Sequence, residues 1–249
     1  MQPGTLAPIF TASAYNSLTK EVADVDLSSF KGSYIVLLFY TGDFGPSLLA
    51  DLMSFQDAAK EFKMSDEVYL LAISTDTVES HRAFGELSQE EGGLQGQQCI
   101  LVEDKTGDIS KKYHVYDAAF HKARPTYIII DEEGEVIASI SNDKKVGGNL
   151  HEVVRIISAC KLCDKEGAWS NLRGTSSDWK PGMELVNTMV GKVETVKEKE
   201  ASTTSQEIVG EVPEYEEATD ETVIVNEMKL APTLNDHLED AEKKKQEAT

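Results

Sequence analysis

The sequence predicts a three-layer α/β domain followed by an acidic C-terminal tail. Two apolar runs, residues 34–40 and 68–74, are rich in β-branched and aromatic side chains. Runs of this kind form strands that are buried on both faces, which occur in sheets covered by helices. Two further strands, 126–130 and 136–140, flank a turn at 131–134 and predict a β-hairpin.

Helix and loop signals fill the segments around these strands. Apolar residues at helical spacing predict the helices, and Gly, Pro or capping residues mark their ends. In chain order we expect a loop-like lead-in (3–16) with Ile9 and Phe10 as core anchors, a short helical turn (27–32), a helix capped by Ser47, a helix (77–87), a short strand (99–102), a short helix (108–113) and an amphipathic helix (150–163). Helices between consecutive strands place the sheet in the middle layer.

The loop after the first buried strand is where chemistry is expected. The turn from a strand into a helix is a common site in α/β proteins, because free amide groups converge at the helix N-terminus. Gly42, Gly45 and Pro46 predict such a loop, but residues 34–57 contain no Cys, His, Lys or Arg. The loop is therefore expected to lack a reactive group.

Composition excludes several classes of partner. A net charge of −20 and a pI near 4.6 argue against binding of nucleic acids or anionic membranes. No apolar run is long enough to span a bilayer, and the first residues lack the basic and apolar regions of a signal peptide. Three cysteines, Cys99, Cys160 and Cys163, are too few for a disulfide framework and favour a reducing compartment. We therefore expect a cytoplasmic protein.

The composition changes near residue 190, so we expect a domain at 1–190 and a largely disordered tail at 191–249. Residues 201–249 contain 13 acidic and four basic residues, and such a segment buries too little apolar surface to fold alone. Within it, residues 222–225 could add a strand to a partner, although a solvated tail is favoured. Residues 234–246 could form a frayed helix.

Several motifs match those of one known family. They are Ala7-Pro8-Ile9-Phe10, Phe39-Tyr40, Asp43-Phe44, Ser74-Thr75-Asp76, Ser80-His81-Arg82-Ala83, Asn142-Asp143 and Trp179-Lys180-Pro181-Gly182. Across residues 5–190 the chain resembles the peroxiredoxins of the typical two-cysteine type. The resemblance implies a thioredoxin-like sandwich, thioredoxin-dependent peroxidase activity, and a homodimer formed through the strand at 136–140. It also implies that such dimers join into a ring through the loop around residue 48.

The chain departs from this family at the positions that carry peroxide chemistry. Leu48 stands at the peroxidatic cysteine and Thr175 at the resolving cysteine. The other departures are Gly45 for the threonine beside the thiolate, Leu49 for the proline after the cysteine, Pro125 for the first arginine and Gly148 for the second. Arg124 is adjacent to the first arginine position, but one step along an extended chain turns a side chain to the other face. Because peroxide reduction needs a thiolate stabilised by positive charge, we expect no activity at this site.

The sequence therefore assigns no catalytic, cofactor-binding or metal-binding residue. It predicts an inactive peroxiredoxin-like protein that acts as an oligomeric scaffold, a chaperone-like binder or a regulatory subunit assembled with active peroxiredoxin chains. The alternative is a thiol-dependent redox enzyme, a peroxidase or a disulfide-exchange protein, that uses Cys160 and Cys163.

The remaining candidate residues have simpler structural explanations. Cys160 and Cys163 form a C-x-x-C at a helix C-terminus, which does not lower a thiol pKa, so a partly buried pair is favoured over a redox couple. A zinc site would need further ligands. Cys99 is expected in the core, and His81 is expected to be structural rather than a general base. Asp43-Phe44-Gly45 matches a triplet of protein kinases, but no phosphate-binding loop or paired lysine accompanies it. The acidic tail lacks the alternating ligand spacing of a calcium-binding loop.

Overall fold

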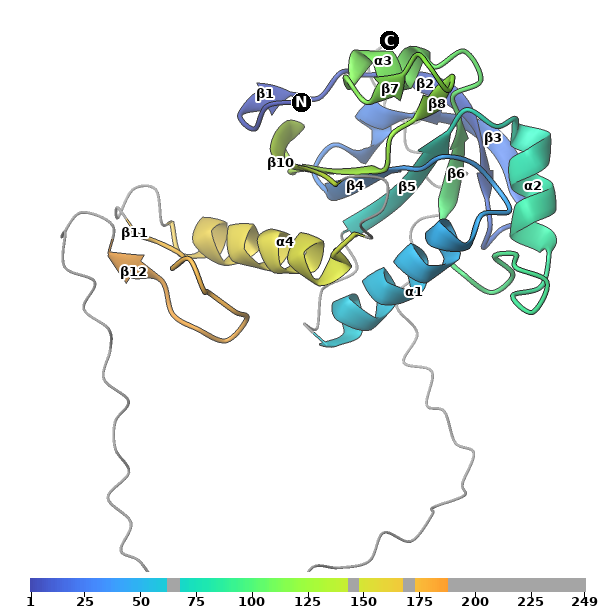
Figure 1. Cartoon of the computed structure of the whole chain (residues 1–249). Helices are drawn as coiled ribbons and strands as arrows, with labels where there is room; N and C mark the ends of the chain where they lie inside the picture. Colours follow the sequence, from blue (N-terminus) through green and yellow to red (C-terminus); the bar gives the residue numbers. More distant parts are fainter. Residues whose placement is uncertain (62–67, 143–147, 168–172, 188–249) are drawn as a thin grey trace, which may run out of the picture.

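The computed structural model describes residues 1–61, 68–142, 148–167 and 173–187 (Figure 1). Among them, eight strands form one mixed sheet in the order β1-β10-β9-β4-β5-β6-β2-β3. These strands are β1 (Thr5–Leu6), β2 (Thr11–Asn16), β3 (Glu21–Asp26), β4 (Tyr34–Phe39), β5 (Val68–Ser74), β6 (Ile100–Glu103), β9 (Thr126–Ile130) and β10 (Glu135–Ser141). Two small ladders pair β7 (Tyr116–Asp117) with β8 (Lys122–Ala123), and β11 (Arg173–Gly174) with β12 (Val186–Asn187).

Helices cover both faces of the sheet. The described helices are the 3₁₀ helix η1 (Leu27–Phe30), α1 (Pro46–Glu61), α2 (Val78–Glu86), α3 (Asp108–Lys112) and α4 (Leu150–Lys165). Side chains of α1, α2 and α4 form one apolar cluster with the sheet, and α3, η1 and the segment around Phe10 contribute to a second cluster on the other face. The predicted thioredoxin-like three-layer architecture is thus confirmed.

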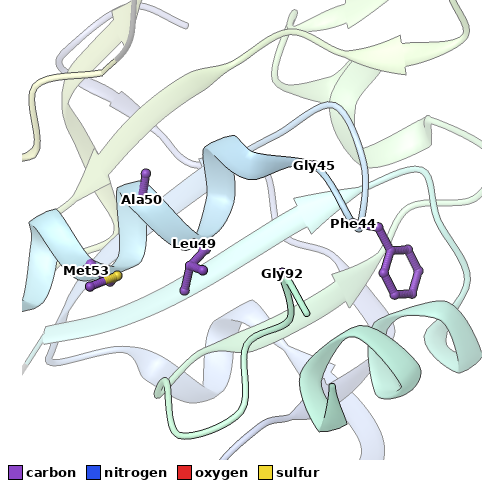
Figure 2. Close-up of a pocket in the computed structure, with 6 residues that line it drawn as sticks. All are labelled: Phe44, Gly45, Leu49, Ala50, Met53 and Gly92. Carbon is purple, nitrogen blue, oxygen red and sulfur yellow. The ribbon is translucent and has the colours of Figure 1, made fainter. Parts of the chain in front are cut away.

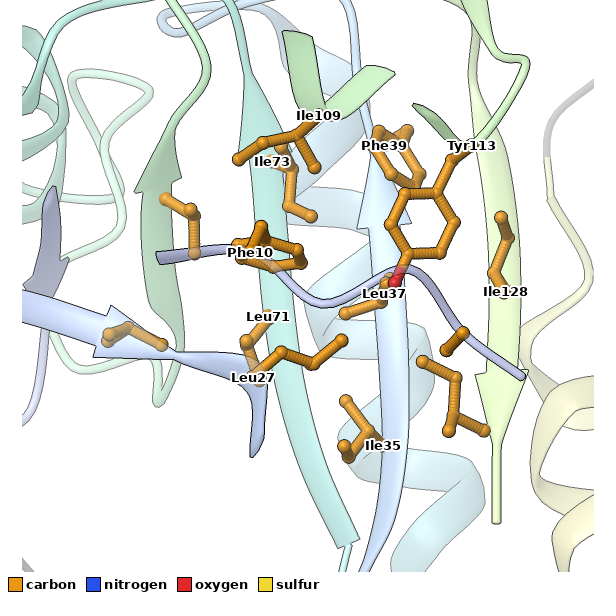
Figure 3. Packing of buried hydrophobic residues seen from close by; sticks show 14 of the residues in the cluster. Phe10, Leu27, Ile35, Leu37, Phe39, Leu71, Ile73, Ile109, Tyr113 and Ile128 are labelled. Atoms are coloured by element: carbon orange, nitrogen blue, oxygen red, sulfur yellow. The ribbon is translucent and has the colours of Figure 1, made fainter. Parts of the chain in front are cut away.

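Strand β4 lies at the centre and is buried on both faces, as predicted. All six of its side chains are buried. It is parallel to β5 and antiparallel to β9, so both of its edges are hydrogen-bonded. Leu37 and Phe39 point into the cluster around Phe10 (Figure 3), and Val36 and Leu38 point into the cluster under α1 and α4. Because successive side chains of a strand point to opposite faces of the sheet, β4 contributes to the apolar clusters on both faces.

The N-terminal lead-in differs from the prediction of a loop. Residues 11–16 form β2, which pairs antiparallel with both β3 and β6. This hairpin is missed because β2 and β3 read TASAYN and EVADVD, with few large apolar residues. The prediction that Ile9 anchors the core is also wrong: Ile9 is 63% exposed, whereas its neighbour Phe10 is only 4% exposed. Adjacent residues of an extended segment face opposite sides.

Two element boundaries also need correction. Helix α1 begins at Pro46, so Ser47 lies inside the helix and is not its N-cap. Proline is favoured in the first helical turn because its missing N–H has no intrahelical acceptor there. Strand β6 begins at Ile100, one residue after the predicted start at Cys99.

The other predicted elements are present. The hairpin of β9 and β10, the helix after Thr77 and the long helix α4 lie where the sequence places them. The predicted tail, with its possible strand at 222–225 and helix at 234–246, lies outside the described residues. Among the described residues, no helix combines the length and apolar character needed to cross a membrane.

Candidate functional site

The loop between β4 and α1 is held by a buried polar network centred on Asp43. The Asp43 carboxylate accepts hydrogen bonds from the hydroxyl groups of Tyr40 at 2.6 Å and Ser80 at 2.7 Å. His81 Nδ1 lies 3.0 Å from the same carboxylate, and the two side chains are 0% and 2% exposed. Because an ionised carboxylate only accepts hydrogen bonds, Nδ1 carries the proton that joins the pair.

Hydrogen bonding keeps Asp43 ionised despite its burial. Burial acts to raise the pKa of this carboxyl, but the hydrogen bond and charge of His81, with the hydroxyls of Tyr40 and Ser80, outweigh it and lower the pKa overall. The prediction of a structural role for His81 agrees with this geometry, because the histidine connects α2 to the loop. Its Nε2 atom is buried and has no hydrogen-bond partner.

Gly42 brings a second carboxylate to the same loop. The Asp43 N–H donates to Asp76 Oδ2 at 2.7 Å. A Cβ at residue 42 would lie 2.8 Å from Asp76 Oδ2 and 3.0 Å from Lys122 Nζ, so a larger residue would displace them. The φ of +153° at Gly42 also favours glycine.

Leu48, where the resemblance expects the peroxidatic cysteine, is a core residue. It is 0% exposed and packs in the cluster that contains Leu52 of α1 and Leu150 of α4. A hydrocarbon side chain in this cluster supplies neither a nucleophile nor an acid. The adjacent Leu49 packs against the same cluster and is partly exposed.

A tyrosine fills the side-chain space of Gly148, where the resemblance expects the second arginine. The hydroxyl of Tyr127, on β9, hydrogen-bonds the Asp51 carboxylate, one helical turn after Leu48. A Cβ built on Gly148 would lie 1.7 Å from this hydroxyl oxygen, so residue 148 is glycine because Tyr127 occupies its side-chain space. Burial raises the pKa of Asp51, and the Tyr127 hydrogen bond opposes that shift.

The first arginine position is also without a charge. Pro125 is neutral, and the adjacent Arg124 lies on the surface, where its Nε is 3.3 Å from Asp117 Oδ2. The Arg124 side chain is 63% exposed. Thr175 follows β11 and is partly exposed. The structure therefore places no cationic partner for Leu48 at these sequence positions.

None of the three thiols lies in an environment that favours the thiolate. Burial raises the pKa of Cys99 to about 12. Burial, then the nearby Asp164, raises the pKa of Cys160 to about 11 and also raises that of Cys163. Cys160 and Cys163 lie in the C-terminal half of α4, where the helix dipole also disfavours negative charge.

An apolar groove borders the loop on its exposed side (Figure 2). Phe44, Leu49 and Met53 line it together with Gly92. Phe44 is 56% exposed, Met53 is 45% exposed, and the Phe44 ring lies 5.1 Å from the ring of Phe84. In the described part of the chain, no group of three or more His, Cys, Asp or Glu side chains is arranged to hold a metal.

Acidification tests the Asp43 network. A carboxyl whose pKa is lowered by folding stabilises the folded protein at pH values above its pKa in the unfolded chain, about 3.9. That stabilisation is lost as the pH falls through the pKa of the carboxyl in the folded protein. We expect Asp43→Asn to lower the melting temperature at pH 7 by a few degrees and to flatten its decline between about pH 4 and pH 2. Calorimetry across this range measures both effects. The control Glu133→Gln removes an exposed carboxylate from the β9–β10 turn, and an equal effect of both variants would contradict the assignment.

The Tyr127–Gly148 packing gives a coupled stability test. Gly148→Ala should lower the free energy of unfolding by about 1–3 kcal/mol, the usual cost of overpacking a core. In a Tyr127→Leu background the same substitution should cost much less, because the obstructing ring is gone. Urea unfolding of the four proteins measures this coupling. Equal costs in both backgrounds would show that Tyr127 does not determine the glycine.

Comparison with known proteins identifies the family. The model of the AhpC/TSA family matches residues 3–139. A thioredoxin peroxidase of Echinococcus granulosus is 32% identical over 192 residues, which cover 77% of this chain and 95% of that protein.

Solved structures agree with this match. The reduced 2-Cys peroxiredoxin of Plasmodium vivax is 27% identical, with a TM-score of 0.66 over 75% of this chain and 93% of that one. Plasmodium yoelii Prx1a, modified at its N-terminus and described as an artifactual octamer, is 27% identical, with a TM-score of 0.59 over 72% and 99% of the two chains. With a strand-centred thioredoxin-like core, a matching family model and relatives of this similarity, the chain belongs to the peroxiredoxin (AhpC/TSA) family.

Proposed function

We propose that this chain is a cytoplasmic peroxiredoxin-family protein without peroxidase activity at the Leu48 position, and that it acts through assembly. Its role is that of a scaffold, a chaperone-like binder or a regulatory subunit of rings that contain active peroxiredoxin chains. The buried Leu48 is the observation that carries the proposal.

The missing chemistry supports the first half of the proposal. Peroxide reduction needs a thiolate, positive charge that stabilises it, and donors that hold the departing oxygen. Leu48 has no such group. Asp51, one turn further along the same helix and hydrogen-bonded to Tyr127 of β9, brings a carboxylate instead of a cation. A cysteine placed there would have its pKa raised by burial and by that negative charge.

The edge of β10 supports the second half. Its partner β9 lies on one side, and β1 covers only Val136 and Glu135 on the other. Beyond Val136 the outer edge has no partner strand among the described residues, while Ile137, Ala138 and Ile140 are only partly buried. An unpaired apolar edge is protected most simply by the same edge of a second copy. The groove at Phe44 offers a second apolar surface for a ring of dimers.

A thiol-dependent redox enzyme is the second candidate function. The match to thioredoxin peroxidases favours this alternative over an inactive protein. Cys160 and Cys163 lie one helical turn apart, and both are partly accessible. In such a reaction the two thiols would give two electrons and two protons to the peroxide, leaving a disulfide that an external dithiol reduces. Their raised pKa values oppose this chemistry at neutral pH.

Peroxide consumption distinguishes the two functions. We expect the purified protein, with thioredoxin or dithiothreitol as reductant, to consume hydrogen peroxide no faster than free cysteine does. The variant Cys160→Ser/Cys163→Ser should behave identically, and Cys99→Ser is its matched control. Peroxide consumption that disappears in the double variant would establish the redox function. Peroxide consumption that survives in the double variant would contradict the proposed inactivity of the site at Leu48.

Dimer formation tests the proposed interface. Ala138→Lys and Ser139→Lys place a charge on either face of β10, and at least one should weaken the dimer tenfold or more, about 1.4 kcal/mol. Ala118→Lys, on the exposed β7–β8 turn, makes the same type of change away from the edge. Analytical ultracentrifugation over a concentration series measures the dissociation constants. A wild-type monomer at micromolar concentration would refute assembly through β10.

A further inference from the structure

One described surface is basic although the chain is strongly acidic. It consists of α3 and the β7–β8 hairpin, and we call it the α3–β8 surface. Its exposed Lys and Arg side chains are Lys111, Lys112, Lys122 and Arg124, and His121 and Phe120 are exposed between them. The acidic Asp108 of α3 is exposed as well. Residues 105–124 contain five Lys or Arg and two Asp, whereas the whole chain has a net charge of −20.

Side-chain contacts hold α3 and the hairpin together as one surface. Lys111 Nζ lies 5.1 Å from the centre of the Tyr116 ring. The Tyr116 hydroxyl lies 3.2 Å from His121 Nδ1, which connects both strands of the hairpin. A Cβ at Gly107, just before α3, would meet the Tyr116 ring at 2.3 Å, so the helix packs directly on the hairpin. Figure 1 shows α3, β7 and β8 side by side at one end of the sheet.

Three of the four Lys and Arg side chains of this surface have a carboxylate neighbour, and Lys112 has only a carbonyl among the described residues. Lys111 bonds Asp108 at 3.1 Å and Arg124 bonds Asp117 at 3.3 Å, which accounts for both acidic residues of the segment. Lys112 makes one long hydrogen bond of 3.4 Å, to the carbonyl of Ile9. Lys122 lies beside Asp76 at Gly42. The surface therefore keeps a positive excess for an additional anionic group.

The chain itself supplies a segment of matching charge. Residues 211–221, EVPEYEEATDE, contain six acidic residues and no basic residue. They begin 24 positions after Asn187, the last described residue. An unstructured linker of about 24 residues would have an r.m.s. end-to-end distance of about 25–30 Å, comparable to the size of a small domain. Attachment to the same chain raises the effective concentration of the segment at the surface.

Charge also selects between this surface and the apolar groove at Phe44. The groove is bordered at Gly92 by the exposed Glu90 and Glu91, which would repel an acidic segment. A separate polyanion is a poorer partner for the α3–β8 surface, because it would be repelled by the net charge of −20. A segment of the same chain is repelled by the same net charge, but its covalent attachment keeps its concentration at the surface high.

We propose that residues 211–221 bind the α3–β8 surface of their own chain. The contact is electrostatic, so it is weakened by salt and adds little to the melting temperature. It covers Lys111, Lys112 and the hairpin, and it hides the basic region of the domain from other anionic partners. The proposal is independent of whether the Leu48 site has activity.

Lysine footprinting of the full chain tests this contact. The protein is treated briefly with an acetylating reagent, and the modification rate of each lysine is measured by mass spectrometry. We expect Lys111 and Lys112 to react roughly twofold faster or more when ionic strength rises from about 0.02 M to 0.5 M. If residues 211–221 cover the two lysines about half of the time at low salt, their release roughly doubles the time for which the lysines are accessible. Lys31 and Lys180, exposed elsewhere, are internal references.

Two tail variants separate a specific contact from general repulsion. Glu214→Gln/Glu216→Gln/Glu217→Gln should accelerate modification of Lys111 and Lys112 at low salt. Glu239→Gln/Asp240→Asn/Glu242→Gln removes the same charge outside the segment and should leave those rates unchanged. Equal rates in all three proteins, or equal acceleration by both variants, would overturn the proposal. Protection that is lost on dilution would assign the segment to a neighbouring copy and refute binding within one chain.

Discussion

The burial of β4 on both faces is the constraint on which the rest of the structure depends. A strand without solvent contact must pair its backbone on both edges, and β5 and β9 provide that pairing. It also needs cover above and below the sheet, which α1 and α4 provide on one face and the segment around Phe10 on the other. The loop at Asp43 and the start of α1 are placed by the end of this strand, so the candidate site is positioned by the core itself.

The loop at Asp43 combines a polar framework with apolar packing at the start of α1. Asp43, Tyr40 and His81 form a buried network around the Asp43 carboxylate, which is costly to break because Tyr40 and His81 Nδ1 would lose their shared acceptor. One turn away, Leu48 adds to the apolar core and Tyr127 takes the space above Gly148. The polar residues that shape the loop are thus separable from the residues that perform family chemistry.

Periodicity and family motifs predicted most of the sheet, but not the long-range contacts beside the candidate site. The strands β4, β5 and β9 were predictable because long apolar runs leave few other conformations. The β2–β3 hairpin was not, because its small and acidic residues take their strand conformation from pairing with β6. The resemblance marked Leu48 and Gly148 as departures from the family pattern. It could not show that Tyr127 joins Asp51 and excludes a side chain at 148, since these residues are far apart in sequence and meet only in the folded protein.

The contact between Tyr127 and Gly148 also restricts the mutational paths open to this chain. An arginine at position 148 would place its Cβ 1.7 Å from the Tyr127 hydroxyl oxygen, so that substitution alone would damage the packing. Tyr127 must change first, and that change alone removes the hydrogen bond to Asp51. Neither substitution is neutral when it is made singly. Selection for a stable core therefore couples positions 127 and 148, and a side chain can enter at 148 only together with a smaller residue at 127.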